Sequence, residues 1–192
     1  MSLYQIRKAS PLVHCLTNYV AAPLTANGLL AIGASPVMMD EINEVEEMVS
    51  NADSVLLNIG TINARTAEAM LLAGKKANAL GVPVVFDPVG AGATSFRRKV
   101  TESILQEVDI DLLRCNAGEL AAIAGVDWHS KGVDSGDGEM DIEAIAKSAA
   151  QTYGCLVIVT GLEDCLTDGE QVIHIPGGVE QTISITGSGC LL

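Results

Sequence analysis

An α/β fold with a mainly parallel central sheet, covered by helices on both faces, is predicted by three observations. Short apolar or β-branched runs alternate several times with longer amphipathic or Ala-rich segments. The composition is 48% hydrophobic but only 3% aromatic, so the core must be built from Ala, Val, Ile and Leu. No internal repeat or linker interrupts the 192 residues, and we therefore expect a single domain covering 1–192.

In the first part of the chain, buried β-branched runs predict strands, and apolar residues spaced three and four apart predict helices. Residues 1–10 are expected to form a loosely structured lead-in. Pro23 fits a helix only in its first turn, and Gly81 suits the left-handed position after a helix. The predicted elements are a strand at 11–16, a helix at 20–32, a turn at 33–36, a strand at 37–39, a helix at 41–51, a strand at 54–59 and a helix at 66–80.

The second part continues the alternation and adds a hairpin. Asn116 is predicted to cap a helix, with Glu119 in the capping-box position three residues later. An Asp-Gly pair at 168–169 predicts the hairpin turn, and 127–140, rich in Asp, Gly and Ser, is expected to be a mobile surface loop. The predicted strands lie at 82–86, 111–115, 155–159 and 182–186, the hairpin at 166–175, and the helices at 97–107, from 116, and at 141–154.

The charge and the cysteines limit the classes of partner and compartment. A formal net charge of -13 excludes nucleic acid and anionic membranes as expected partners, because such a surface repels both. The five cysteines form no C-x-x-C pair and the three histidines are scattered, so no zinc site is expected. Unpaired cysteines indicate a reducing, cytoplasmic location. We expect neither a signal peptide nor a membrane span, since no apolar run approaches about 18 residues.

Several polar residues follow the predicted strands at their carboxyl ends, where open α/β sheets bind ligands. Asp87 and Glu119 are hard oxygen ligands of the kind that Mg²⁺ prefers, and Arg114 can neutralise phosphate oxygens. Glycine turns at 90–92 and 187–189 can supply backbone amides. This set predicts a site for a magnesium-bound nucleotide. The alternatives are that Asp87 caps the turn before Pro88, that Glu119 is only a capping-box acid, and that Arg114 is a surface residue.

The segment 186–190, Thr-Gly-Ser-Gly-Cys, is the most chemically suggestive stretch. Gly187 and Gly189 permit φ > 0 and a close backbone approach, so a strand–turn–helix here predicts an anion pocket. Cys190 would lie at or near the helix N-cap, where a thiolate is favoured. Neither glycine turn completes G-x-G-x-x-G, and no P-loop motif is present. The cysteines expected to pack in the core are Cys15, Cys155 and Cys165. Met38 and Met39 are read from the pattern alone as gap-filling core residues.

Taken together, the motifs resemble the hydroxyethylthiazole kinase family of the ribokinase-like superfamily over essentially the whole chain. The motifs that carry the resemblance are PLVHCLTNYV from residue 11, ANGLLAIGASP from 26, LNIGT from 57, DPVGAGAT from 87, NAGE from 116, KGVDS from 131, VTG from 159 and TGSGC from 186. The resemblance implies a ribokinase-like three-layer αβα sandwich. It also implies ATP- and Mg²⁺-dependent phosphorylation of 4-methyl-5-(2-hydroxyethyl)thiazole in thiamine salvage.

The resemblance also assigns roles to residues of this chain. It implies that Met38 contacts the thiazole and that Gly187 lies beside the substrate. It also implies a homotrimer with active sites between subunits, in which Asn18 and Met38 would serve a neighbour's site. The residues implied to contact ATP are Arg114 and Thr160, and those implied to organise the metal and phosphates are Asp87 and Glu119. Cys190 stands where most of the superfamily carries a catalytic aspartate. It would act as a weaker or differently tuned base, or only position the substrate.

The sequence departs from the family pattern at its C-terminal end. Family members continue past the glycine-rich motif with further helices, so we expect a truncated kinase domain with a partly uncovered apolar sheet face. Two alternatives to thiazole phosphorylation therefore remain open. One is a related kinase of another small alcohol, such as a hydroxymethylpyrimidine, and the other is a non-catalytic thiazole-binding trimer.

Overall fold

The structure of the protein is a computed structural model that describes residues 2–126, 141–178 and 187–191. Within these residues, eight strands form one sheet in the order β2-β1-β3-β4-β5-β6-β7-β8. The strands are β1 (Leu12–Leu16), β2 (Ser35–Val37), β3 (Ser54–Asn58), β4 (Val84–Asp87), β5 (Leu112–Asn116), β6 (Leu156–Thr160), β7 (Glu163–Thr167) and β8 (Val172–Pro176). Neighbours from β2 to β6 are parallel, and β7 and β8 add antiparallel pairs. The predicted mainly parallel sheet is confirmed.

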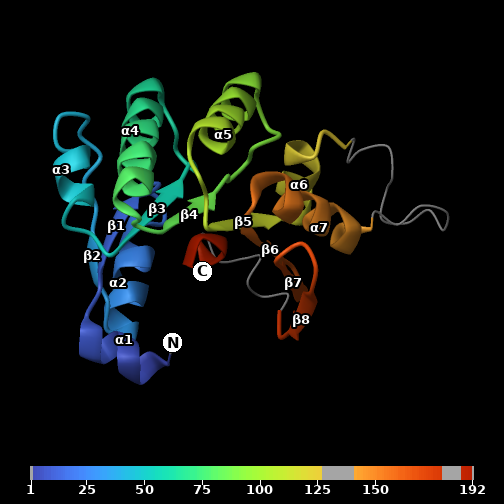
Figure 1. Ribbon diagram of the computed structural model, residues 1–192, viewed down its shortest axis with the longest axis horizontal. Coiled ribbons are helices and arrows are strands. Elements are labelled where there is room, and N and C mark those ends of the chain that lie inside the picture. Colours follow the sequence, from blue (N-terminus) through green and yellow to red (C-terminus); the bar gives the residue numbers. More distant parts are fainter. Residues whose placement is uncertain (1, 127–140, 179–186, 192) are drawn as a thin grey trace.

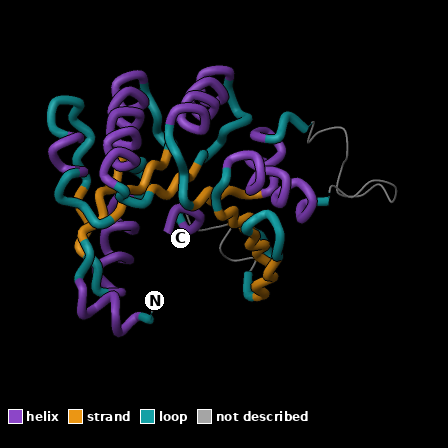
Figure 2. The backbone as a smooth tube through the Cα atoms, in the orientation of Figure 1, coloured by secondary structure: helices purple, strands orange, loops and turns teal. Residues whose placement is uncertain are grey.

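Helices lie on both sides of this sheet, as predicted (Figure 1). The helices are α1 (Leu3–Ala9), α2 (Ala22–Ile32), α3 (Val45–Val49), α4 (Ala64–Leu80), α5 (Ser95–Glu107), α6 (Ala117–Ile123), α7 (Ile142–Tyr153) and the 3₁₀ helix η2 (Ser188–Leu191). Helices α3 to α7 form one continuous layer, while α1, α2 and η2 lie on the opposite side (Figure 2). Among the described residues, no helix is both long and apolar enough to cross a membrane.

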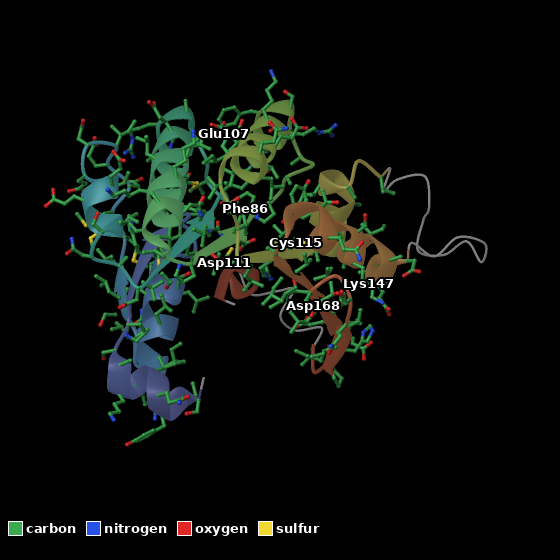
Figure 3. The ribbon with its side chains drawn as sticks, in the orientation of Figure 1. Phe86, Glu107, Asp111, Cys115, Lys147 and Asp168 are labelled. Carbon is green, nitrogen blue, oxygen red and sulfur yellow. The ribbon has the colours of Figure 1, made fainter. Side chains whose placement is uncertain are left out.

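The main hydrophobic core lies between the sheet and the α3–α7 layer. Leu57, Phe86 and Leu113 are fully buried at its centre, and Phe86 and Cys115 are labelled there in Figure 3. Small residues such as Ala73 on α4 and Ala146 on α7 let these helices approach the sheet closely. The opposite sheet face is apolar but less covered, with half-buried Leu56, Val85, Leu112 and Ile158 and exposed Leu156, Ile173 and Ile175.

Two local predictions are wrong, the loose lead-in at 1–10 and the strand at 37–39. Residues 3–9 form helix α1, because Ser2 and Gln5 make a capping box that closes its first turn. Strand β2 begins at Ser35 and ends at Val37, so Met38 and Met39 follow it as loop residues. Pro36 is tolerated because β2 is an edge strand, paired only with β1. The hairpin is confirmed, but its first strand starts earlier, at Glu163.

Most other helix and strand predictions agree with the structure to within about three residues. Pro23 lies in the first turn of α2, and Gly81 has φ +69 after α4. The helix predicted at 41–51 is shorter, only α3, and the preceding residues form a turn. The predicted loop at 127–140 and the predicted strand at 182–186 lie outside the described residues.

Candidate active site

Four polar side chains form a row across the carboxyl ends of four neighbouring parallel strands. Asn58, Asp87 and Thr160 are the last residues of β3, β4 and β6, and Arg114 lies two residues before the end of β5, all on the less covered face of the sheet. These four residues are hereafter the polar row. Asn58 Nδ2 donates to Asp87 Oδ2 at 2.6 Å. Arg114 Nη1 lies 3.5 Å from Asp87 Oδ1, and its Nη2 donates to Thr160 Oγ1 at 3.0 Å. The row is therefore one continuous chain of hydrogen-bonded groups.

Asp87 is the most electrostatically perturbed group of the polar row. Burial raises the pKa of Asp87 to about 7, although the Arg114 guanidinium opposes this rise and the negative charge of Glu119 adds to it. The hydrogen bonds from Arg114 and Asn58 also act to lower it. Burial therefore outweighs the attraction of Arg114, and Asp87 keeps its proton up to about pH 7. A cation bound beside it would favour its ionised form.

Among the described residues, part of the donor capacity of Arg114 has no partner. Its side chain is only 9% exposed, and its Nε is buried without a hydrogen-bond partner among the described residues. The backbone at Gly189 approaches closely, since a Cβ there would lie 3.4 Å from Arg114 Nη2. A buried guanidinium with an unpaired N–H, next to a glycine backbone, suits recognition of an anionic oxygen.

Glu119 has the capping role that its position predicts, and a second contact as well. Asn116 caps α6 in a complete capping box, in which Glu119 Oε2 accepts from Asn116 N at 2.9 Å. Its other oxygen, Oε1, accepts from Gly90 N at 2.8 Å and so anchors the glycine turn that follows β4. Each oxygen of a carboxylate has lone pairs beyond the one used here, so the capping role and a metal role are compatible.

The structure brings Cys190 to the polar row through Asn18. Asn18 Nδ2 lies 2.8 Å from Asn58 Oδ1 and 3.5 Å from Cys190 Sγ, and Asn18 Oδ1 accepts from Ala21 N. Cys190 is the third residue of η2, and its N–H donates to Gly187 O at 3.0 Å. This amide is therefore already used within the turn and does not add to the predicted anion pocket. Gly187 has φ +83, as predicted, but Gly189 is not among the residues with positive φ.

A cavity of about 300 Å³ opens beside Asn58. Its walls are apolar at Cys15, Met38 and Met70 and polar at Thr17 and Asn63. Arg65 fixes the outer wall by donating to both the carbonyl and the carboxylate of Asp40, at 2.8 Å and 3.0 Å. Met38 is therefore a wall of a ligand-sized cavity and not the gap-filling core residue that the pattern alone suggested. Burial raises the pKa of the Cys15 thiol to about 12, so Cys15 contributes no charge to the cavity wall.

Two residues with a central place in this site were not among the predicted site residues. Asn58 links Asn18 to Asp87, and its sequence signal is the one that identified Asp87: a polar residue at the end of a buried strand. Arg97 joins the turns after β3 and β4 through backbone carbonyls. An arginine side chain that binds main-chain oxygens of other segments leaves no pattern in the sequence.

The described residues contain no group of three or more His, Cys, Asp and Glu side chains that could hold a metal ion unaided. Of the described carboxylates, Asp87 belongs to the polar row and Glu119 lies close enough for its charge to raise the pKa of Asp87. Mg²⁺ is commonly held by one or two carboxylates together with substrate phosphates and water. The donor set therefore fits an ion that arrives with a phosphate ligand and does not fit a resident, fully caged ion.

The sheet and its two helix layers define an α/β protein with a ribokinase-like fold, and the polar row lies at the strand ends. A ribokinase-like superfamily protein from Enterococcus faecalis superimposes with a TM-score of 0.64 at 10% identity, over 93% of this chain and 66% of that one. At this identity, the likeness concerns the fold alone. The predicted fold class is confirmed.

The sequence signature of the hydroxyethylthiazole kinase family matches residues 3–192. A hydroxyethylthiazole kinase from Lysinibacillus sphaericus is 58% identical over 192 residues, which are 100% of this chain and 75% of the relative. The solved hydroxyethylthiazole kinase of Pyrococcus horikoshii is 40% identical, with a TM-score of 0.88 over 98% of this chain and 70% of that one. The chain belongs to the hydroxyethylthiazole kinase family, and is an enzyme of the kinase class, as its motifs predicted.

Proposed function

We propose that this chain transfers the γ-phosphoryl group of ATP to the hydroxyl of 4-methyl-5-(2-hydroxyethyl)thiazole, as a step in thiamine salvage. The observation that carries the proposal is the placement of the small cavity beside the polar row, with Asn58 belonging to both. A volume of about 300 Å³ lies at the lower limit of the ~300–1,000 Å³ typical of ligand pockets. It suits a small ring and not a nucleotide.

On this proposal, the acceptor lies in the cavity and ATP lies along the polar row. Met38 packs against the thiazole ring, while Asn18 and Gly187 border the hydroxyethyl group. Arg114 and Thr160 bind ATP, with the buried Arg114 guanidinium donating to phosphate oxygens. In-line phosphoryl transfer has a loose transition state, so positioning and charge neutralisation supply most of the catalysis.

Asp87 and Glu119 would hold Mg²⁺ together with ATP, either directly or through water. When bound, the ion supplies positive charge that neutralises the phosphate oxygens. The residues themselves fit this role: the pKa of Asp87 is raised to about 7 by burial, with a contribution from the charge of Glu119, and a cation would reverse that effect. Cys190 would accept the proton of the acceptor hydroxyl, a role that the 3.5 Å contact of its Sγ with Asn18 Nδ2 at the polar row supports.

A homotrimer is part of the proposal. Large apolar side chains are exposed along α1 and α2 and at the cavity rim: Tyr4, Tyr19, Val20 and Leu30 are 75%, 79%, 52% and 58% exposed. Tyr19 also lines the cavity, so a neighbouring subunit seated here would complete the acceptor site. Light scattering at several concentrations tests this: we expect three times the 20.0 kDa chain mass, and a monomer throughout would contradict it.

All five cysteines are free thiols, which supports the proposed cytoplasmic location.

Mass-spectrometric detection of thiazole phosphate, after incubation with Mg-ATP and hydroxyethylthiazole, tests the reaction. Hydroxymethylpyrimidine serves as the competing alcohol, and Asp87→Asn as the variant expected to be inactive. Faster phosphorylation of the pyrimidine would replace the proposed substrate. If calorimetry detects thiazole binding but no product forms, the chain would be a thiazole-binding protein and not a kinase.

A further inference from the structure

The guanidinium of Arg97 binds three backbone carbonyls that belong to two different turns. Its Nη1 donates to Ile59 O at 2.6 Å and to Val89 O at 2.7 Å, and its Nη2 donates to Gly60 O at 2.7 Å. Ile59 and Gly60 follow β3, whereas Val89 follows β4. One half-buried side chain therefore joins the two turns that border the candidate site.

The turn after β3 supports the acceptor side of the site. Asn18 packs directly on Gly60, where an added Cβ would lie only 2.7–2.8 Å from the Asn18 side chain. Gly60 N also donates to Asn58 Oδ1 at 2.9 Å, and Thr61 Oγ1 accepts from Tyr19 N at 3.3 Å. A shift of this turn would displace Asn18 and, with it, the contact to Cys190.

The turn after β4 supports the phosphate side. It starts at Asp87 and delivers Gly90 N to Glu119 Oε1 at 2.8 Å, with Gly90 in a left-handed conformation at φ +68. Arg97 lies beneath it, since a Cβ on Gly90 would meet Arg97 Cδ and Nη1 at 3.7 Å. The position of Glu119 relative to Asp87 depends on this turn.

Arginine is suited to this contact because of its geometry. A guanidinium is planar and carries its donors in a fixed fork, so both hydrogens of Nη1 and one of Nη2 can meet separate carbonyls at once. The Arg97 backbone is itself fixed, since Arg97 N donates to Thr94 Oγ1, the N-cap of α5. A lysine ammonium is a compact point charge and would not reproduce the same spread of contacts.

We propose that Arg97 is a positioning residue that holds the acceptor half of the site in register with the phosphate half. The assignment of one half to the acceptor and the other to the phosphate rests on the proposed function. Loss of Arg97 removes no contact within either half, but it loosens both turns and lets the halves move relative to one another. The expected consequence is slower phosphoryl transfer with nearly unchanged binding of each substrate by itself.

The test compares Arg97→Lys and Arg97→Met with the control Lys99→Met, which removes an exposed cation from the same helix. For Arg97→Met, we expect kcat to fall by ~100-fold, the cost of a misplacement of about 1 Å in a positioned reaction. The dissociation constants of hydroxyethylthiazole and of ATP, measured separately by calorimetry, should change by less than about threefold, and Arg97→Lys should be intermediate. A kcat equal to that of Lys99→Met overturns the proposal, as does a loss carried entirely by weaker substrate binding.

A second readout does not depend on catalysis. Amide hydrogen exchange at Gly60 and Gly90, whose N–H groups bind Asn58 and Glu119, reports the order of each turn. Arg97→Met should accelerate exchange at both amides and not at buried strand amides such as Phe86. If the wild type makes no thiazole phosphate, the proposed function fails, and the exchange result still decides on Arg97. Unchanged exchange at both amides overturns its positioning role.

Discussion

Asp87 is a buried carboxyl that lies between an arginine and an asparagine and close to a second carboxylate. Its raised pKa has a consequence for stability as well as for ligand binding. In the unfolded chain it ionises near its ordinary pKa of 3.8, whereas in the folded protein it keeps its proton until about pH 7. Between these values the folded state binds more protons, so rising pH favours unfolding.

We therefore expect metal-free wild type to lose stability relative to Asp87→Asn as the pH rises from about 4.5 to 7.5. The relative loss should be roughly 3 kcal/mol, because each pKa unit corresponds to about 1.4 kcal/mol. Denaturant unfolding in the presence of a chelator, at four or five pH values, measures it. A pH-independent difference between the two proteins would show that Asp87 titrates alike in both states.

Replacing Cys190 tests whether its sulfur accepts a proton. If it does, Cys190→Asp should keep kcat within about tenfold of the wild type, while Cys190→Ala should lose ~100-fold, the lower limit of typical general-base contributions. Steady-state kinetics measures both variants, with ATP binding as the control. A loss beyond about a thousandfold for Cys190→Asp, or ~4 kcal/mol, would count against a base role and favour positioning.

Arg114 is the residue on which ATP recognition depends most in this proposal. Arg114→Ala should weaken ATP binding at least tenfold, since charge-assisted hydrogen bonds contribute about 1.5–3 kcal/mol. The binding of hydroxyethylthiazole should remain. Calorimetry with each substrate measures this split, and Arg114→Lys controls for the unpaired charge left on Asp87. Unaltered ATP affinity and turnover would remove Arg114 from the site.

At the scale of elements, the packing of α4 on α5 depends on a glycine in the middle of a 17-residue helix. A Cβ on Gly74 would lie 2.7 Å from both methyl groups of Val108. Helix propensity alone predicts that Gly74→Ala stabilises the protein by about 1 kcal/mol. We expect net destabilisation of up to about 2 kcal/mol, because overpacking of this kind costs about 1–3 kcal/mol and the propensity gain offsets about 1 kcal/mol of it.

A double-mutant cycle with Val108→Ala checks this explanation by denaturant unfolding. The double variant should be more stable than the sum of the single effects, since Ala at 108 makes room for the new methyl group. Additive effects would show that the two positions are not coupled and that the close approach of α4 and α5 does not limit the substitution.

The elements also show which sequence signals were sufficient. Buried apolar runs located β3, β4, β5 and β6, and with them the edge where Asp87, Arg114 and Thr160 meet. Helix α1 was missed although Ser2 and Gln5 form a capping-box pattern, because the segment buries no side chain and so has no apolar stripe. Strand β2 was misplaced by the presence of Pro36, which only an edge strand accommodates.

The candidate site was less predictable than the fold, for physical reasons. Asn58 lies next to Asp87 because β3 pairs with β4, and the sequence by itself does not specify this pairing. The three carbonyl contacts of Arg97 and the packing of Asn18 on Gly60 depend on tertiary geometry that no spacing encodes. The roles drawn from the family resemblance remain predictions until the variants above are measured.

At the scale of the whole molecule, the two faces of the sheet differ. The face under α3–α7 is buried, whereas Leu156, Ile173 and Ile175 are about half exposed on the other face. Exposed apolar groups gathered on one face favour contacts with apolar ligands. This 192-residue chain should therefore bind a hydrophobic dye in its folded state.

The variant Ile173→Lys with Ile175→Lys should reduce that dye fluorescence by more than half while leaving the unfolding midpoint nearly unchanged, because exposed residues contribute little burial energy. Fluorescence titration and thermal unfolding of both proteins measure this. The control is Glu163→Lys on the adjacent strand, at an exposed position that contributes no apolar surface. Equal dye binding by all three proteins would place the dye elsewhere.

The contact between Asn18 and Cys190 closes a loop of 172 residues in sequence. Contacts of such long range form late during folding, because the entropy of closing the intervening chain must be overcome first. We expect the strands that supply the polar row to dock before Cys190 meets Asn18. During refolding, catalytic activity should therefore return later than the circular-dichroism signal of helices and strands. The rate at which activity returns would then report the last step of folding.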